Sequence, residues 1–183
     1  MAPHPFIVGH SWVSRLRDSE ELSSVFKYIA KPGGNFNTLR EKLMNYPVCG
    51  EADYVYIILG GNDCDSARDT REICGVKDSC KKFADVCRAV FPNAKLIFFQ
   101  VEDRYDPSSW EKIEDHKRKG NKFNKWLNTF DGKDGLFCIK GSAGFSSPLN
   151  YALDGVHLNE VGNFRLAARI QQHYDQKKAE CWA

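Results

Sequence analysis

Long hydrophobic runs are missing from this 183-residue chain: the longest cover residues 54–59 and 96–99. Both fall far short of the ~20 apolar residues that a membrane-spanning helix needs. An excess of one charge is missing as well, because 26 Lys and Arg residues are offset by 24 Asp and Glu residues. This balance provides no electrostatic footprint for nucleic acid or an anionic membrane surface. We therefore expect neither a membrane span nor a nucleic-acid partner.

Signals for export and for metal binding are also missing. The first five residues lack the basic and long apolar segments of a signal peptide, and no Asn-x-Ser/Thr glycosylation site occurs. The seven cysteines are an odd number and include no Cys-x-x-Cys pair or zinc spacing. These features favour a cytoplasmic, reducing location and argue against a metal site.

The cysteines differ in their expected burial. Cys80 and Cys87 fall on the apolar face of a predicted helix, which indicates buried thiols. Cys64, Cys74 and Cys181 fall in segments that we expect to be exposed, where they could pair in an oxidising compartment.

Apolar runs alternate with helical patterns along the whole chain, which has the length of a single domain, residues 1–183. Strands are predicted at residues 5–8, 26–30, 53–59, 95–101 and 136–139, and helices at 12–26, 38–44, 76–91 and 110–130. Gly120 is a candidate interruption of the fourth helix. A last helix begins after Asn159, with Val161, Phe164, Ala168 and Ile170 expected to face inward. This alternation predicts a doubly wound α/β sheet.

Residues able to do chemistry follow several of the predicted strands. Ser11 follows the first strand and opens a helix, and Gly33-Gly34 follows the second strand. Asn62 follows the third strand, and its amide could donate to a developing oxyanion. Asp154 and His157 follow the fifth strand at a spacing that lets a carboxylate orient an imidazole. Ligands bind at the carboxyl ends of the strands in such sheets, so we expect these loops to converge.

This constellation resembles the SGNH (GDSL-type) hydrolase superfamily, and the matching residues stand in that family's order. Ser11 matches the nucleophile of the first sequence block, and Asn62 in Gly60-Gly61-Asn62-Asp63 matches the asparagine of the third. Asp154 and His157 match the Asp-x-x-His pair of the last block. The blocks run from residue 9 to residue 157 and so cover most of the chain.

Two details of the resemblance need separate mention. Gly34 matches the glycine of the second block, with Gly33 as the alternative because the register is open. The first block departs from the family, since Gly-His-Ser replaces the usual Gly-Asp-Ser. His10 cannot copy a carboxylate's charge. We formulate the hypothesis that protonated His10 adds positive charge beside the oxyanion and sharpens the acid-side pH dependence.

The resemblance implies a three-layer α/β/α, flavodoxin-like sandwich with a central five-stranded parallel sheet. It further implies that Ser11 attacks an ester, that His157 is the general base, and that Asp154 orients the imidazole. Ser11, Gly34 and Asn62 would form the oxyanion hole. The implied substrate is a small ester, often an acetyl ester, of a carbohydrate, lipid or other alcohol, and no cofactor or metal is needed. A weakly active or inactive binding module of the same fold, such as occurs in mobile-element proteins, is the alternative.

Other residues have less definite interpretations. Tyr105 and Trp110, together with His10 and Gly33, are candidate substrate contacts, although the two aromatic residues could equally be packing anchors. The basic stretch at residues 117–125 is balanced by nearby acidic residues, which predicts a solvated helix face. His116 and His173, on predicted helices, are expected to face solvent. Each active-site candidate also has a structural interpretation, such as a helix cap for Ser11 or a plain turn for the glycines. The four matches in order favour catalysis.

Overall fold

Five parallel strands form the central sheet of the computed structural model, which describes residues 3–17, 22–105, 109–133, 135–139 and 147–181. The strands lie in the order β2-β1-β3-β4-β5. Their bounds are β1 His4–Gly9, β2 Lys27–Ala30, β3 Ala52–Ile58, β4 Lys95–Phe99 and β5 Leu136–Ile139. All five predicted strands are confirmed to within a few residues.

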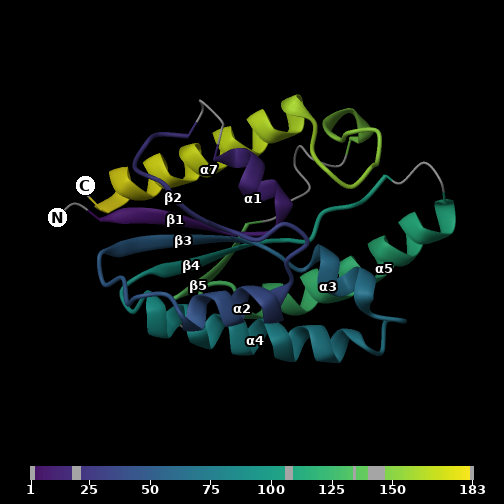
Figure 1. The fold of residues 1–183 in the computed structure, drawn as a ribbon, viewed down its shortest axis with the longest axis horizontal. Coiled ribbons are helices and arrows are strands. Elements are labelled where there is room, and N and C mark those ends of the chain that lie inside the picture. Colours follow the sequence, from purple (N-terminus) through teal and green to yellow (C-terminus); the bar gives the residue numbers. More distant parts are fainter. Residues whose placement is uncertain (1–2, 18–21, 106–108, 134, 140–146, 182–183) are drawn as a thin grey trace.

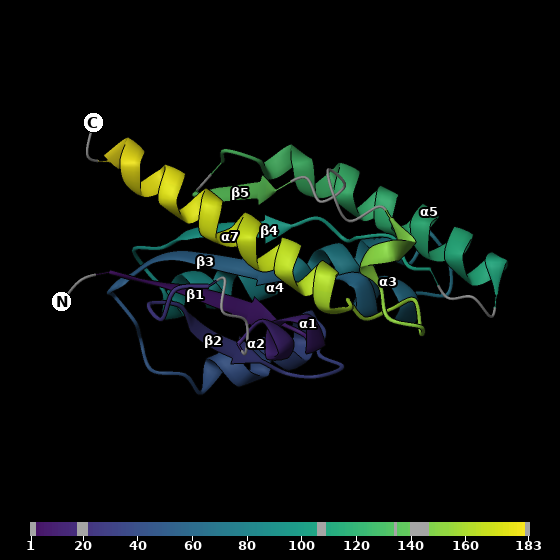
Figure 2. The same cartoon turned by 90° about the horizontal axis from the view of Figure 1, so that it is seen from above.

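Helices cover both faces of this sheet (Figure 1). One face carries α1 (Ser11–Leu16) and α7 (Glu160–Cys181), and α7 runs obliquely across the strands when seen from above (Figure 2). The other face carries α2 (Phe36–Met44), α3 (Gly61–Ser66), α4 (Ile73–Val90) and α5 (Trp110–Leu127). Two short 3-10 helices, Asn128–Phe130 and Pro148–Asn150, complete the described elements. The three-layer α/β/α architecture is therefore confirmed.

The alternation of side chains along β3 explains why its sequence is almost continuously apolar. Val55 and Ile57 pack into the core beneath α2, α4 and α5, whereas Tyr54, Tyr56 and Ile58 pack into the core beneath α1 and α7. A parallel strand covered on both faces has no solvated side, so apolar residues occupy both phases of its pleat.

The first predicted helix is too long. The helix α1 ends at Leu16 because residues 17–21 supply no apolar side chain that could extend its buried face. Residues 18–21 lie outside the described part of the chain. Phe26 then packs in the core as the chain enters β2.

Gly120 does not interrupt the fourth helix. The helix α5 is continuous through Gly120 to Leu127, and a 3-10 turn carries the chain on to Phe130. A Cβ at position 120 would lie 3.3 Å from Cγ1 of Val101, so the glycine allows the helix to approach the segment after β4 closely.

The inward face of α7 is rotated relative to the prediction, although Ile170 is buried as predicted. Val161 and Phe164 are about half exposed, at 50% and 52%. The buried side chains of the helix are Leu166, Ala167, Ile170 and Tyr174. Gly162 sets this rotation, because a Cβ there would clash with the backbone carbonyl of Asn150. Gly162 therefore faces the segment at Asn150, and Val161 and Phe164 point outward.

Of the expectations about the burial of cysteines, one is wrong. Cys64 is completely buried rather than exposed, whereas Cys74 is exposed and Cys80 and Cys87 are buried as predicted. All cysteines whose side chains the structure describes are free thiols. The side chain of Cys181 is not among the described side chains. No helix in the described ranges is long and apolar enough to cross a membrane.

The strand order places a topological switch at the centre of the sheet. From β1 the chain connects to β2 on one side, whereas from β3 it connects to β4 on the other. The loops that leave β1 and β3 therefore diverge over opposite faces and leave a crevice at the carboxyl edge, where ligands bind in sheets of this type.

Candidate active site

Ser11 lies at this carboxyl edge as the first residue of α1, directly after β1. Gly9 ends the strand opposite Ile58 of β3. A Cβ at position 9 would clash with the Ile58 carbonyl and lie 2.7 Å from Cγ2 of Val13. Only glycine therefore allows the chain to turn so tightly into the helix, and the turn places the Ser11 backbone beside the end of β3.

Asp154 and His157 form a hydrogen-bonded pair in the loop before α7. Nδ1 of His157 lies 2.6 Å from Oδ2 of Asp154. The other carboxylate oxygen accepts hydrogen bonds of 2.9 Å from the backbone N–H groups of Val156 and His157. Burial raises the pKa of Asp154, but these hydrogen bonds outweigh it and lower the pKa to about 2. The carboxylate stays ionised at neutral pH and orients the imidazole.

Helix α1 binds the loop that carries this pair. Nε1 of Trp12 donates to the Val156 carbonyl at 3.1 Å, and Nη1 of Arg15 donates to the Leu158 carbonyl at 3.1 Å. The two bonds flank His157 on either side in the sequence. The helix that presents Ser11 therefore also fixes the backbone of the histidine loop, although the bonded residues are 144 and 143 positions apart in the sequence.

A single cavity of about 300 Å³ contains the predicted nucleophile and the predicted base. Its walls include Ser11, Gly33, Asn62 and His157, one residue from each of the four predicted blocks. The loops thus converge as expected.

The two candidate glycines have different environments. The N–H of Gly34 donates to the Lys31 carbonyl at 2.8 Å, and a Cβ on Gly34 would clash with Leu39. Gly33 instead lines the cavity with a φ of +67°, and nothing lies within 4 Å of where its Cβ would be. Among the described residues, no acceptor engages the N–H of Gly33 or of Ser11. The geometry therefore favours Gly33, the alternative, over Gly34 as an oxyanion donor.

Asn62 lies in the first turn of α3 behind the Gly60-Gly61 turn. Gly60 has a φ of +108°, a conformation that residues with side chains rarely adopt. Nδ2 of Asn62 donates to the Gly34 carbonyl at 2.9 Å. An amide nitrogen carries two N–H groups, so one remains for a ligand in the cavity.

His10, at the position where the resemblance leads us to expect an aspartate, caps the amino end of α1. Its Nδ1 accepts a hydrogen bond from the backbone N–H of Trp12 at 3.3 Å, which requires an unprotonated Nδ1. Burial lowers the pKa of His10 to about 3, and the charges of Arg104 and His157 add to this effect. His10 is therefore neutral at neutral pH, and the hypothesis of a protonated His10 beside the oxyanion is wrong.

Tyr105 and Trp110 are not among the residues that line this cavity. The ring of Tyr105 packs on Tyr151 with a centroid distance of 4.9 Å, and its backbone N–H donates to the Gly155 carbonyl at 2.8 Å. It anchors the histidine loop rather than lining the site. Trp110 begins α5 and is 72% exposed, away from the cavity.

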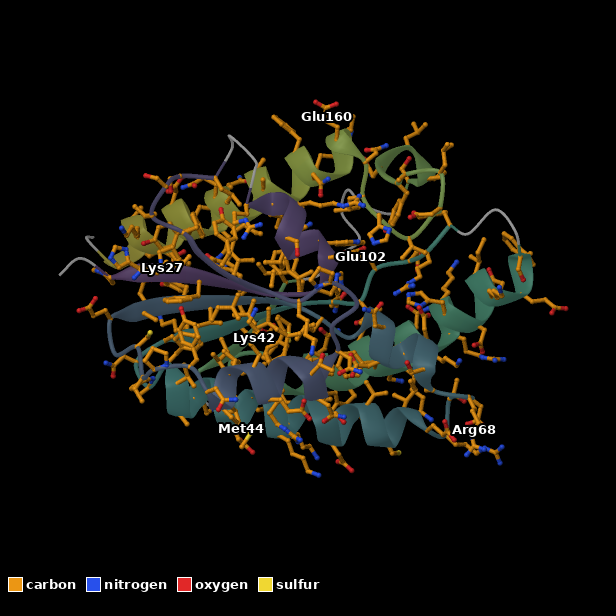
Figure 3. All side chains as sticks on the ribbon, viewed as in Figure 1. Lys27, Lys42, Met44, Arg68, Glu102 and Glu160 are labelled. Carbon is orange, nitrogen blue, oxygen red and sulfur yellow. The ribbon has the colours of Figure 1, made fainter. Side chains whose placement is uncertain are left out.

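The segment after β4 supplies a wall of the cavity that the sequence analysis missed. Glu102, Asp103 and Arg104 all line it, and in the view of Figure 3 Glu102 lies between the layers of α7 and α3. Burial raises the pKa of Glu102 to about 7, and Asp103 adds to this effect while Arg169 opposes it. No regular motif marks this segment, so spacing alone offers no signal for it.

Helix α5 contributes buried polar residues behind this wall. His116 is only 4% exposed and lies 2.5 Å from a carboxylate oxygen of Asp65, so the expectation of a solvent-facing histidine is wrong. His173 is half-buried and hydrogen-bonds the Tyr56 hydroxyl. Lys119 is also buried, in an ion pair with Asp115, so the basic stretch is only partly a solvated face. Within the described ranges, no group of His, Cys, Asp and Glu side chains is arranged to hold a metal ion.

Comparisons with known proteins agree with this fold. No family model matches the sequence, and no curated protein matches it. Among solved structures, a GDSL-like lipase from Bacteroides thetaiotaomicron VPI-5482 is similar with a TM-score of 0.73 and 14% identity, over 95% of this chain and 88% of that one. A carbohydrate esterase family 3 protein from Talaromyces cellulolyticus has a TM-score of 0.65 and 16% identity, over 97% and 99% of the two chains.

A member of the lipolytic protein G-D-S-L family from Veillonella parvula DSM 2008 is also similar, with a TM-score of 0.64 and 14% identity. That match covers 92% of this chain and 95% of the other. The agreement extends over more than nine tenths of this chain in all three cases. The chain therefore has the α/β/α fold of the SGNH (GDSL-type) hydrolases.

Proposed function

We propose that this protein is a serine esterase that removes short acyl groups from small esters. The observation that carries the proposal is the Asp154–His157 pair, joined at 2.6 Å, whose imidazole lines the same cavity as Ser11. A carboxylate, an imidazole and a hydroxyl at one cavity are the groups that nucleophilic acyl transfer requires.

The reaction proceeds in two halves. The Ser11 oxygen attacks the ester carbonyl carbon while Nε2 of His157 takes the hydroxyl proton. Asp154 accepts from Nδ1 and stabilises the imidazolium. When the tetrahedral intermediate collapses, the bond to the alcohol oxygen breaks and Nε2 returns the proton to that oxygen. Water then attacks the acyl-serine in the same way and releases the acid. No cofactor takes part.

The oxyanion of the intermediate needs hydrogen-bond donors. The N–H groups of Ser11 and Gly33 and the second N–H of Asn62 are the candidates, because their residues line the cavity and other acceptors do not occupy these groups. Loss of one such donor typically lowers kcat by about 10²–10³-fold.

The size of the cavity supports a small substrate. A volume of about 300 Å³ is at the lower end for ligand pockets. An acetyl group with a modest alcohol fits this volume better than a long acyl chain. The named functions of the similar structures, lipase and carbohydrate esterase, are compatible with an alcohol of either lipid or sugar type.

Hydrolysis of p-nitrophenyl acetate tests the proposal. We expect Ser11→Ala to abolish turnover, while Ser14→Ala, one helical turn further along α1, leaves it unchanged. A chain-length series from acetyl to decanoyl should show kcat/KM falling with acyl length. Equal rates for wild type and Ser11→Ala would instead support the alternative, a binding module that retains the fold.

Labelling with a fluorophosphonate gives an independent measurement. We expect mass spectrometry to locate the phosphonyl group on Ser11 and on no other serine, and Asp154→Asn to slow the labelling. A label on another serine would contradict the assigned nucleophile.

A further inference from the structure

Arg104 holds Asn62 in one orientation. Nη2 of Arg104 donates to Oδ1 of Asn62 at 2.9 Å, and on the other side Nδ2 of Asn62 donates to the Gly34 carbonyl at 2.9 Å. A guanidinium has only donors and a carbonyl only accepts. The two neighbours therefore fix which end of the amide is oxygen and which is nitrogen.

Asp65 and His116 fix the position of Arg104 in turn. One carboxylate oxygen of Asp65 pairs with Nη1 of Arg104 at 2.5 Å, and the other lies 2.5 Å from Nδ1 of the buried His116. Nε2 of His116 donates to the Glu102 carbonyl at 2.9 Å, two residues before Arg104. Burial raises the pKa of Asp65. The hydrogen bond and charge of His116, followed by the charge of Arg104, outweigh burial, so the pKa of Asp65 lies below its ordinary value. The guanidinium side chain is only 18% exposed.

The orientation of Asn62 decides whether this residue favours or opposes catalysis. The two ends of an amide have nearly the same shape, so sterics alone do not choose between them. With Nδ2 toward the oxyanion the residue stabilises developing negative charge; with Oδ1 there it repels that charge. The ion pair with Asp65 holds the guanidinium of Arg104 where it donates to Oδ1 of Asn62, and Nδ2 is then the end left for the oxyanion.

We propose that Arg104 is a positioning residue for the oxyanion hole and acts through the side-chain amide of Asn62. The inference rests on the proposed esterase function. No family block marks Arg104, and its role follows from the contacts that join the segment after β4 to α3.

A double-mutant cycle tests this coupling. Arg104→Met is expected to lower kcat for p-nitrophenyl acetate by about 10–100-fold, with KM changed less than about two-fold, because part of the donor effect of Asn62 is lost. In an Asn62→Ala background the same substitution should change kcat by less than about three-fold, since the group through which it acts is gone. An equal loss of kcat in both backgrounds would overturn the proposal.

Matched controls separate this effect from general damage. Arg68 pairs with Glu72 at the periphery of the molecule (Figure 3), and Arg68→Met should leave kcat unchanged. Guanidinium ions added to Arg104→Ala should restore part of kcat, whereas the same concentration of sodium ions should not. Should Arg104→Met fail to fold, Asp65→Asn, which loosens the guanidinium, is expected to give a smaller loss of kcat that also disappears in the Asn62→Ala background.

A measurement without catalysis distinguishes failure of this inference from failure of the esterase proposal. In wild type the two Nδ2 protons of Asn62 should give sharp NMR signals at positions shifted from those of an exposed asparagine, because the amide is held at both ends. Arg104→Met should shift and broaden these signals. Unchanged signals would overturn the role of Arg104, whereas failure of the esterase proposal would appear as equal hydrolysis by wild type and Ser11→Ala.

Discussion

His10 makes the stability of this fold sensitive to acid, and the size of the effect follows from the site. The folded protein holds the pKa of His10 at about 3, against an ordinary value of 6.5 in the unfolded chain. Between these values the unfolded chain binds a proton that the folded chain excludes. The free energy of unfolding therefore falls as pH falls through this range, and above it His10 has no effect.

The expected loss at about pH 5 is about 2 kcal/mol from His10 alone, from the linkage relation for these two pKa values. His10→Asn should remove this term, because an asparagine oxygen can cap α1 in place of Nδ1 and does not titrate. Urea denaturation of both proteins at about pH 7.5 and about pH 5 measures the difference. We expect similar stability at the higher pH and a smaller loss for the variant at the lower one.

Parallel losses in the two proteins would refute the reasoning, since they would show that His10 is not held neutral by its surroundings. An NMR titration of the ring gives a direct check: the His10 signals should not shift above about pH 4. The same result would explain how a histidine can replace the usual aspartate here, since the helix cap requires an acceptor and not a charge.

Four further substitutions concern the walls of the cavity and the glycine next to them. Trp12→Phe removes the hydrogen bond to the Val156 carbonyl, and should cost about 1 kcal/mol in urea denaturation and about ten-fold in kcat as the histidine loop shifts. Gly33→Ala meets no atom but keeps an unfavourable φ, so it should fold with a loss of about 1–2 kcal/mol and lose at least ~10-fold in kcat. In Gly34→Ala the new Cβ clashes with neighbouring atoms, so this variant should chiefly have a lower melting temperature. A large loss of kcat in Gly34→Ala with little loss in Gly33→Ala would instead indicate that Gly34 is the oxyanion donor. Glu102→Gln should stabilise the fold by about 1–3 kcal/mol at about pH 8 and not at about pH 4, because a raised folded pKa costs stability as pH rises; equal effects at both pH values in urea denaturation would contradict this.

The central strands were predictable because residues within and directly after each strand determine where it forms and ends. Residues 53–59 combine an apolar run with a Gly-Gly break, and this pattern defines both a strand covered on both faces and its carboxyl end. Ser11 and Asn62 could be predicted for the same reason, since each follows the end of a strand within a few residues. Asp154 and His157 lie well beyond the end of β5, and it is their Asp-x-x-His spacing just before the last helix that indicated them. The doubly wound topology then brings their loops to one edge.

The errors arise where a contact distant in sequence decides the outcome. The orientation of α7 depends on the close approach of Gly162 to the Asn150 carbonyl. The pattern of apolar residues within α7 carries no information about this contact. Gly33 rather than Gly34 is the candidate oxyanion donor because the Lys31 carbonyl accepts a hydrogen bond from Gly34, and the sequence does not show which of the two N–H groups is engaged. His116 was expected on a solvated face because its partners, Asp65 and the backbone at Glu102, lie on other elements.

The dependence of the site on α1 has a consequence for how activity is lost. A helix of six residues is not stable alone in water, so burial of Trp12, Val13 and Leu16 and the bonds to the histidine loop must hold it in place. The same bonds orient the backbone on both sides of His157. Loosening either partner therefore releases the nucleophile and the base together. Perturbations at this contact should abolish hydrolysis before they unfold the sheet, because the core on its other face, beneath α2, α4 and α5, contains no residue of α1.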